Sequence, residues 1–559
     1  MNARLHPRWP DILAGSFLFF ASAAFVLWQN FQVAVLWDLG YLLNTSSRIA
    51  QGQLPYRDFS LVHPPVTFLI QVAILHIFGR SYQFVPVYAA IVSGFGTLLT
   101  WRILGLLLGP TLSARRAALA LSLPLIFLGI HGIYPHPEYD CDCALALLFA
   151  FWLLLHAQRP GSRPWLHWLT GAALILPIFI KQNMGLPVAA VAALAFALEA
   201  VFAYRVKQPV QPFLRILAGM AAAFALALIT LSATVGLANY RFWTITFAAQ
   251  RRLPALGPML EIYRQPSLFW LLPPVILALG LIRTRPNRWL RIAIPILLAA
   301  PALTTAVLFF LADDYDDRAD TLLTLWPLLL LTAADLLLWQ FRKPLAPGLV
   351  VPALALTAIH GTFLSQQLWG STYAIWPFAI LLTAWLLSQL PAPHAAEPLA
   401  WALAAVLTLC GSLYALSHER LTYTDLADGA PISARLPVLH GLAARGPYIP
   451  EFEELLLFAA RTIPPSDPVL ELPGEDPFFY ATGRTPALAA VLFDHTTNPF
   501  TPEQLLSQAR LHNVRWVIWK THLQSSAQPL DDPGRTLALI RVQYTLVQKL
   551  AGYDIYTLR

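Results

Sequence analysis

Charged residues are scarce in this chain of 559 residues: Asp, Glu, Lys and Arg make up 12% of it, whereas 57% is hydrophobic. A soluble protein of this length needs far more charge on its surface, so a purely soluble fold is excluded. Cysteine is also rare. Of the three cysteines, Cys141 and Cys143 are too close in sequence to pair easily, so neither a disulfide framework nor redox chemistry is expected.

Motifs of several common chemistries are missing. The sequence has no Walker loop, no dinucleotide fingerprint and no His-Glu-x-x-His helix, so ATP-driven transport and zinc-protease chemistry lack their usual residues. The net charge is +7, and it comes from residues 1–416, which carry 25 basic and 15 acidic groups against 12 and 15 in residues 417–559. This excess serves as an orientation signal in a membrane rather than as a sign of nucleic-acid binding.

Long apolar runs fill the first three quarters of the chain. Most approach the roughly 20 residues that a helix needs to cross a bilayer. They lie at 12–31, 84–108, 117–134, 143–157, 166–180, 184–203, 213–236, 267–282, 292–312, 321–340, 345–364, 372–390 and 398–416. Because backbone groups in lipid must bond within the segment, the runs predict an all-α polytopic membrane bundle of about 13 helices.

A further apolar run, 61–78, decides the topology. If it lies along the outer face or dips into it, sixteen Lys and Arg of residues 1–416 fall inside and nine outside, as the positive-inside rule requires. A crossing there would reverse this ratio. The sequence Ala21-Ser22-Ala23 in the first run resembles a signal-peptidase site, but a retained signal anchor fits better, because further crossings follow at once.

The composition changes after residue 416, where a stretch of ordinary polarity begins. Val469–Leu472 and Trp516–Trp519 are typical of short buried strands, and 451–462 and 502–512 show helical spacing. We therefore expect a transmembrane domain over residues 1–416, with an outer loop at 32–83, and a small α/β domain over residues 417–559. An odd number of crossings places that C-terminal domain outside the cytoplasm.

Carboxylates gather where the predicted helices end on the outer side. Asp38 follows the first crossing, and Glu138, Asp140 and Asp142 precede the crossing at 143–157. Ionisable groups at a membrane edge are costly and commonly functional, so the outer face is where we expect the chemistry. The simpler reading is that these acids solvate helix ends.

The outer loop carries an ordered set of motifs: Trp37-Asp38-Leu39-Gly40-Tyr41, a segment from Arg48 to Phe59 with Gly52 and Pro55-Tyr56, and then Val62-His63-Pro64-Pro65. The set resembles the first outer loop of GT-C class membrane glycosyltransferases, in particular the aminoarabinose-transferase, protein O-mannosyltransferase and rhizobial lipopolysaccharide-transferase branches. Many relatives have Asp-Glu where this chain has Asp38-Leu39, and some have Lys where it has His63.

The resemblance implies transfer of a sugar from a polyprenyl-phosphate carrier to an envelope lipid, glycan or protein acceptor at the outer face of the plasma membrane, here a bacterial inner membrane. Asp38 is the candidate base or acceptor-orienting group, and Asp142 and Asp140 match the class's second acidic site. Facing carboxylates would either raise one pKa or jointly bind a divalent metal such as Mg or Mn, with Asp38, Glu138 and Asp142 as the possible ligands.

Basic and aromatic residues on the same side are expected to bind the substrate, the cations through its phosphate and the aromatic rings through the sugar. They are Tyr41, Arg57, His63, Lys181, Arg251, Arg252 and Tyr373. Each also has a structural alternative: Arg57 could pair with Asp58, Lys181 could snorkel to the interface, and Tyr373 could belong to the aromatic belt.

Two other functions stay open. A transporter or flippase of lipid-linked saccharides would also want outer aromatic and basic groups, but it should place ionisable residues inside its crossings and on both faces. A non-catalytic assembly protein of envelope polysaccharide would tolerate the loss of Asp38. The sugar, the acceptor and the oligomeric state cannot be inferred from the sequence.

Overall fold

The computed structural model describes residues 9–252, 257, 260–283, 287–312, 322, 325–340, 349–364, 374–390, 395–417, 427–524, 530 and 532–559. In this part of the chain, seven helices are long and apolar enough to cross a membrane, and six shorter apolar helices accompany them. The protein is therefore an integral, multi-pass membrane protein, as the apolar runs predict.

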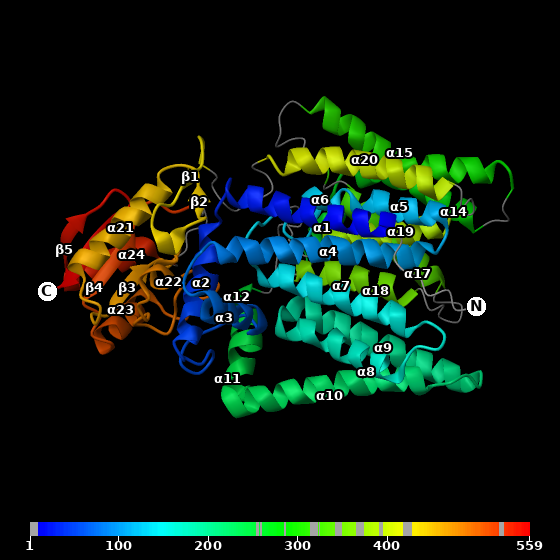
Figure 1. The fold of residues 1–559 in the computed structure, drawn as a ribbon. Helices are drawn as coiled ribbons and strands as arrows, with labels where there is room; N and C mark the ends of the chain where they lie inside the picture. The colour runs from blue at the N-terminus through cyan, green and yellow to red at the C-terminus, as the bar shows by residue number, and fades with distance from the viewer. Residues whose placement is uncertain are drawn as a thin grey trace.

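The long bundle is built from helices that run back and forth along one direction (Figure 1). They are α1 (Trp9–Asn30), α4 (Phe84–Leu108), α5 (Leu112–Ser122), α6 (Leu125–Leu128), α7 (Tyr139–Ala157), α8 (Pro164–Ile175) with the 3₁₀ turn η1 (Leu176–Phe179), α9 (Gln182–Arg205), α10 (Gln211–Thr234), α14 (Leu268–Ile282), α15 (Leu290–Leu311), α17 (Leu325–Gln340), α18 (Val350–Phe363), α19 (Trp376–Ser388) and α20 (Ala396–Tyr414).

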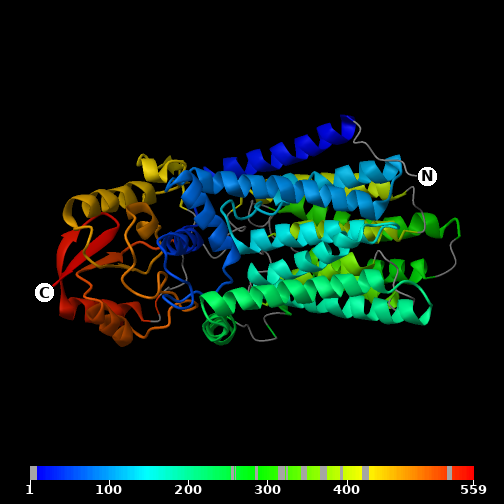
Figure 2. The ribbon, with the colours of Figure 1, turned by 60° about the horizontal axis from the view of Figure 1, so that its bottom comes forward.

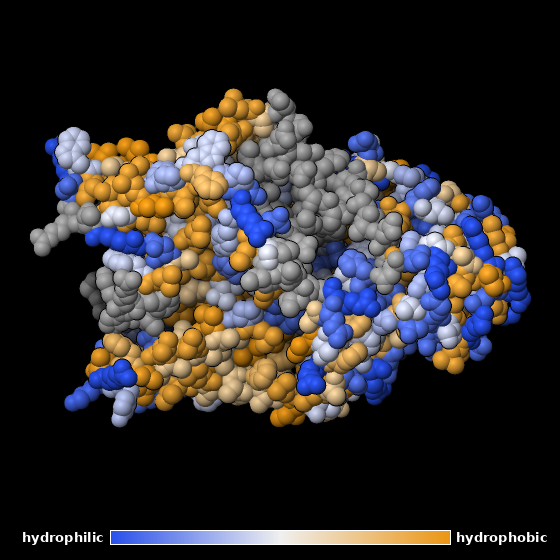
Figure 3. Space-filling model, turned by 180° about the vertical axis from the view of Figure 1, so that it is seen from behind, coloured by the Kyte–Doolittle hydropathy of each residue, from blue (hydrophilic) through white to orange (hydrophobic). Residues whose placement is uncertain are grey.

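The two ends of the bundle differ. One end, which we call the domain end, carries the C-terminal domain, and the other is the distal end (Figure 2). Ion pairs of Arg115 with Asp11 (3.8 Å) and of Arg116 with Glu397 (3.7 Å) join helix starts at the distal end. Figure 3 shows hydrophobic residues along the flank of the bundle and hydrophilic ones over the C-terminal domain, which is the pattern of a bilayer-embedded body with a solvated cap.

The segment between α1 and α4 leaves and re-enters the bundle at the same end. The Asn30 amide donates to the Gly441 carbonyl (3.0 Å), and the Tyr82 N–H donates to the Val438 carbonyl (3.1 Å), so both flanks of the segment touch the C-terminal domain. Between them lie α2 (Leu36–Ala50) and α3 (Val66–Phe78), which pack together. Because the segment returns to the end of the bundle that it leaves, α3, at about 20 Å, need not cross the bilayer. The position of the run at 61–78 on the outer side stays a prediction.

One predicted crossing differs in detail. The run at 117–134 forms α5 and the single turn α6, and the chain is no longer helical after Leu128. Pro124 lies between the two helices and has no N–H to donate, which explains the break. The chain that follows, with Gly129 and Gly132 folded tightly onto preceding carbonyls, leads to the acidic start of α7.

The C-terminal domain is a small mixed sheet covered by helices. Its four-stranded sheet has the order β3-β4-β6-β5, with β3 (Val469–Leu472) parallel to β4 (Trp516–Lys520) and the pairs of β6 (Tyr553–Leu558) with β4 and with β5 (Tyr544–Lys549) antiparallel. The helices α21 (Tyr448–Thr462), α22 (Phe478–Thr482), α23 (Pro502–Leu511) and α24 (Pro533–Gln543) complete it, with the short pair β1 (Ile432–Ser433) and β2 (Ala443–Ala444). The predicted α/β character, both strands and both helices are confirmed.

Candidate active site

Asp38 lies in the first turn of α2, at the domain end of the bundle, and is half-buried. A polar network supports the same turn: His136 Nε2 accepts a hydrogen bond from the Val35 N–H (3.2 Å), and burial lowers the pKa of His136 to about 3, which keeps its ring neutral. Asp38 is thus held on a fixed element.

We call Asp38 and Glu138, the N-cap residue of α7, the acidic pair, because the negative charge of Asp38 acts on the Glu138 carboxyl. Glu138 is 2% exposed, and burial raises the pKa of its carboxyl well above the usual range. The negative charge of Asp38, and then that of Asp140, raises this pKa further. The two carboxyls therefore share one electrostatic environment, although 100 residues separate them in sequence.

Asp140 and Lys181 form a buried ion pair next to this acidic pair. Lys181 Nζ lies 2.8 Å from Asp140 Oδ2, and the two side chains are 4% and 0% exposed. The ammonium group also lies 4.0 Å from the ring centroid of Tyr139, a cation–π contact. Lys181 thus acts first as the counter-ion of Asp140, and a phosphate that reached it would compete with that carboxylate.

An aromatic stack joins the outer-loop residues to α7. The imidazole of His63 lies against the ring of Tyr139, with the centroids 3.9 Å apart. His63 Nδ1 is 3.3 Å from the Tyr41 hydroxyl, and the Tyr56 hydroxyl donates to the His63 carbonyl (2.7 Å). The structure therefore brings Tyr41 and His63 to the start of α7. Their order in the sequence does not by itself predict this contact.

Asp142 points to different partners from Asp140. Its Oδ2 accepts a hydrogen bond from the Thr67 hydroxyl of α3 (2.7 Å), and its Oδ1 accepts one from the Tyr88 hydroxyl of α4 (2.6 Å). These strong contacts tie α7 to α3 of the outer-loop segment and to α4 of the bundle. The geometry assigns Asp142 an anchoring contact, while Glu138 is the residue coupled to Asp38.

A long, mainly apolar groove of about 1430 Å³ begins at Asp142 and Tyr88. It follows α4 from Tyr88 to Gly109, a length of about 30 Å, and so matches the hydrocarbon core of a bilayer. Arg115 and Arg159 line its distal end. The groove thus has the length and the apolar lining that suit a hydrocarbon chain, and it ends beside the buried Asp142.

The other expected substrate-binding cations lie nearer the surface. Arg57 Nε pairs with Asp58 (3.0 Å), and the Arg57 side chain is 55% exposed. Of the two roles that the sequence leaves open for Arg57, this ion pair is the simpler one. Arg251 donates to the carbonyl of His495 in the C-terminal domain (3.2 Å). Arg252 ends α12 (Ala248–Arg252), whereas Tyr373 lies outside the described residues.

The expected metal ligands do not form one cluster. Within the described ranges, no three His, Cys, Asp or Glu side chains are placed to hold a metal ion together. Both carboxylate oxygens of Asp142 already accept hydrogen bonds, away from the pair that Asp38 makes with Glu138. A Mg or Mn ion bound by the three carboxylates stays a prediction, and no step below depends on it.

Several residues of the site were not assigned these roles by sequence reasoning. Glu138 was expected only as a supporting ligand, and Thr67, Tyr88 and Tyr139 were not expected at all. Tyr88 offered a signal, since it is a hydroxyl group in the otherwise apolar first turns of α4. Nothing in the sequence indicated that this hydroxyl would reach Asp142 on another helix.

No family model matches the chain, and no curated protein sequence matches it. Similar solved structures include ArnT from Cupriavidus metallidurans bound to undecaprenyl phosphate, at 14% sequence identity and a TM-score of 0.46 over 98% of this chain and 96% of that one. They also include the Archaeoglobus fulgidus oligosaccharyltransferase in the apo form, at 11% identity and a TM-score of 0.44 over 93% and 70%. At these identities the similarity is one of chain arrangement only. Both are membrane glycosyltransferases of the GT-C class, the class that the outer-loop motifs resemble.

Proposed function

We propose that this protein is a membrane glycosyltransferase that moves a sugar from a polyprenyl-phosphate donor to an envelope lipid, glycan or protein acceptor. The observation that carries the proposal is the bilayer-long apolar groove that ends at the buried Asp142, two residues along the chain from the buried ion pair of Asp140 with Lys181. A hydrocarbon carrier fits the groove, and acid–base chemistry fits its end. The outer-loop motifs around Asp38 add independent support, and the arrangement of Lys and Arg favours a reaction on the outer face of the plasma membrane.

Asp38 is the proposed base. It takes the proton of the acceptor hydroxyl while that oxygen forms a bond to the anomeric carbon, and the bond from this carbon to the carrier phosphate breaks. Polyprenyl phosphate leaves with the electron pair, the sugar is inverted at the anomeric centre, and the proton stays on the carboxylate. Phosphate is already a good leaving group, so the main demands on the protein are a base and nearby positive charge.

Glu138 tunes that base. The buried Glu138 carboxyl does not ionise easily beside a second carboxylate, so the pair holds a proton at a pH where an isolated carboxyl would have lost it. Once the pair has lost that proton, Asp38 beside a second negative charge is a stronger base than an exposed Asp. Exposed cations at the same end, Arg57 and Arg251, can meet the phosphate.

The test supplies the purified wild-type protein, in detergent, with a panel of polyprenyl-phosphate sugars and measures release of free polyprenyl phosphate, with and without an envelope lipid extract. Release that depends on one donor and is stimulated by the extract is the expected result. A parallel experiment reconstitutes the protein in vesicles and follows the same labelled donors between leaflets.

Donor-dependent movement between leaflets with no release of carrier would overturn the proposal and identify a transporter. Release without any extract would mean that water replaces the acceptor, and the transferred sugar would then appear free in solution. That result would remove the acceptor from the proposal and contradict the function as stated.

A further inference from the structure

The start of α2 is not capped by its own sequence. Val35, the N-cap residue, makes no side-chain capping hydrogen bond, so the first N–H groups of the helix need partners from elsewhere. The Leu36 N–H donates to Oε1 of Gln524, in the C-terminal domain (2.7 Å), and His136 from the bundle accepts from Val35 (3.2 Å). The first turn, which carries Asp38, is therefore held from both parts of the protein.

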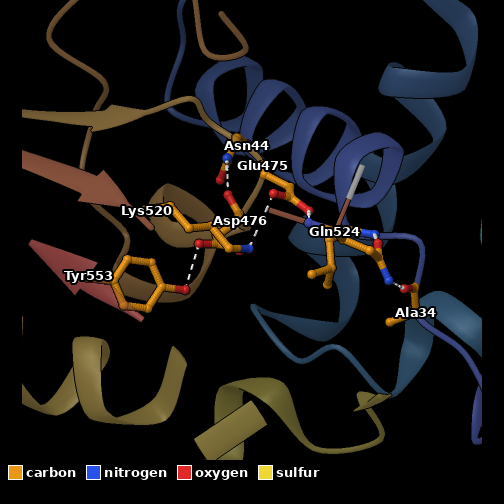
Figure 4. Close-up of polar contacts among 8 residues, drawn as sticks. Ala34, Asn44, Glu475, Asp476, Lys520, Gln524 and Tyr553 are labelled. Atoms are coloured by element: carbon orange, nitrogen blue, oxygen red, sulfur yellow. Dashed lines mark hydrogen bonds and ion pairs between the residues drawn. The ribbon is translucent and has the colours of Figure 1, made fainter. Parts of the chain in front are cut away.

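Gln524 is itself held in one orientation. Its Nε2 donates to the Ala34 carbonyl (2.7 Å), and its backbone N–H donates to Oε1 of the buried Glu475 (2.9 Å), as Figure 4 shows. The other carboxylate oxygen of Glu475 lies 3.4 Å from Lys520 Nζ. The side-chain amide of Gln524 thus forms hydrogen bonds with the backbone on both sides of the N-cap residue, at Ala34 and Leu36.

A second set of contacts continues along α2. Asn44 donates from Nδ2 to the Asp476 carbonyl (2.7 Å) and accepts from the Tyr480 N–H (3.0 Å). A Cβ atom on Gly40 would lie 2.2 Å from the Glu475 carbonyl oxygen, so only glycine allows this approach. The domain therefore contacts α2 at its start, at Gly40 and at Asn44, over more than two turns.

The charges behind these contacts are buried and paired. Asp476 binds Lys520 Nζ (2.7 Å) through Oδ1 and the Tyr553 hydroxyl (2.7 Å) through Oδ2, and it is fully buried. Such an arrangement is costly to disturb. It gives the segment Glu475-Asp476 a fixed position in the domain, against which α2 can be placed.

We infer that Gln524, supported by the Glu475-Asp476 segment, is a positioning residue: the C-terminal domain sets the place of the first turn of α2, and with it the Asp38 carboxylate. The consequence for turnover rests on the proposed function. The consequence for α2 itself does not, because it follows from the hydrogen bonds alone.

The test compares Gln524→Met with Gln548→Met in the full chain reconstituted in lipid nanodiscs. Methionine keeps the length of the side chain and loses its hydrogen bonds, which leaves the buried Leu36 N–H unsatisfied. Gln548 is the matched control, since it lies on the exposed strand β5 and its side-chain amide donates to the carbonyl of its neighbour Lys549 (3.1 Å). Hydrogen exchange of peptides that cover residues 36–44 is the first readout.

We expect Gln524→Met to speed exchange in this peptide by about tenfold, the size of a lost buried hydrogen bond, while β3 and β4 stay protected and Gln548→Met changes nothing. If β3 and β4 also lose protection, the second variant is Asn44→Ala, which removes a contact with the domain from the α2 side. It should speed exchange over residues 36–44 while β3 and β4 stay protected. Unchanged exchange over residues 36–44 in both variants would overturn the inference.

Turnover supplies the second readout, with the donor that the wild type uses. A positioning role predicts that kcat falls by about tenfold or more while KM for the donor stays within about twofold, because donor contacts are intact and only the base is misplaced. An equal fall in the amount of active protein, with kcat per folded molecule unchanged, would contradict it. Faster α2 exchange in Gln524→Met, together with a wild type that uses no donor at all, would contradict the proposed function and leave the inference about α2 intact.

Discussion

The buried ion pair of Lys181 with Asp140 gives the most quantitative prediction. Its atoms lie 2.8 Å apart and both side chains are almost fully buried. Removal of one partner from such a pair leaves an uncompensated charge and costs about 3–5 kcal/mol of folding free energy, whereas replacement of both by neutral groups costs much less. Lys181→Met and Asp140→Asn should each destabilise the protein by that amount, and the double variant by clearly less than their sum.

A double-mutant cycle on unfolding in mixed micelles, followed by tryptophan fluorescence, measures the coupling. The control is the exposed pair of Arg57 with Asp58, where Arg57→Met should cost at most about 1 kcal/mol. Additive effects of Lys181→Met and Asp140→Asn would refute the reasoning. Lys181 would then be free of Asp140 in solution and available to a phosphate.

Two further predictions concern the acidic pair and the domain contact. Glu138→Gln should move the acid limb of the pH–rate profile to lower pH. Burial and the Asp38 charge raise the pKa of the Glu138 carboxyl, and glutamine removes this titrating group from beside the base. An acid limb at unchanged pH would rule out an electrostatic effect of Glu138 on Asp38. Gly40→Ala should loosen the contact of the C-terminal domain with α2, because the added Cβ would clash with the Glu475 backbone, and faster proteolysis would report it. The control is Gly105→Ala in α4, where a Cβ meets nothing within 4 Å, and this change should be neutral or slightly stabilising.

Much of the fold could be predicted from the sequence, because a bilayer leaves few choices. Apolar length identifies the crossings, and the distribution of Lys and Arg predicts that the run at 61–78 stays on one side, in agreement with α3, which lies at the domain end. The break after Leu128 is the exception. Pro124 was visible, but whether a proline kinks a membrane helix or ends it depends on the neighbours that satisfy the freed carbonyls.

The site could be predicted only in part. Asp38 and the acidic start of α7 stand out, since carboxylates at helix ends are conspicuous in so apolar a chain. Which acid faces Asp38 depends on the rotation of α7, and one residue changes that direction by about 100°. Asp142 turns to Tyr88 and Thr67, while Glu138 is the acid whose pKa the Asp38 charge raises.

The measurement that tests the central claim most directly is the single-turnover rate of carrier release by Asp38→Asn, with the donor that the wild type uses. Asp58→Asn is the matched control, because it makes the same change in the same loop at an exposed carboxylate. Loss of a general base predicts a fall of at least about 100-fold for Asp38→Asn, and a change within about twofold for Asp58→Asn. Equal rates for Asp38→Asn and the wild type, with both folded, would contradict the assignment of Asp38 as the base.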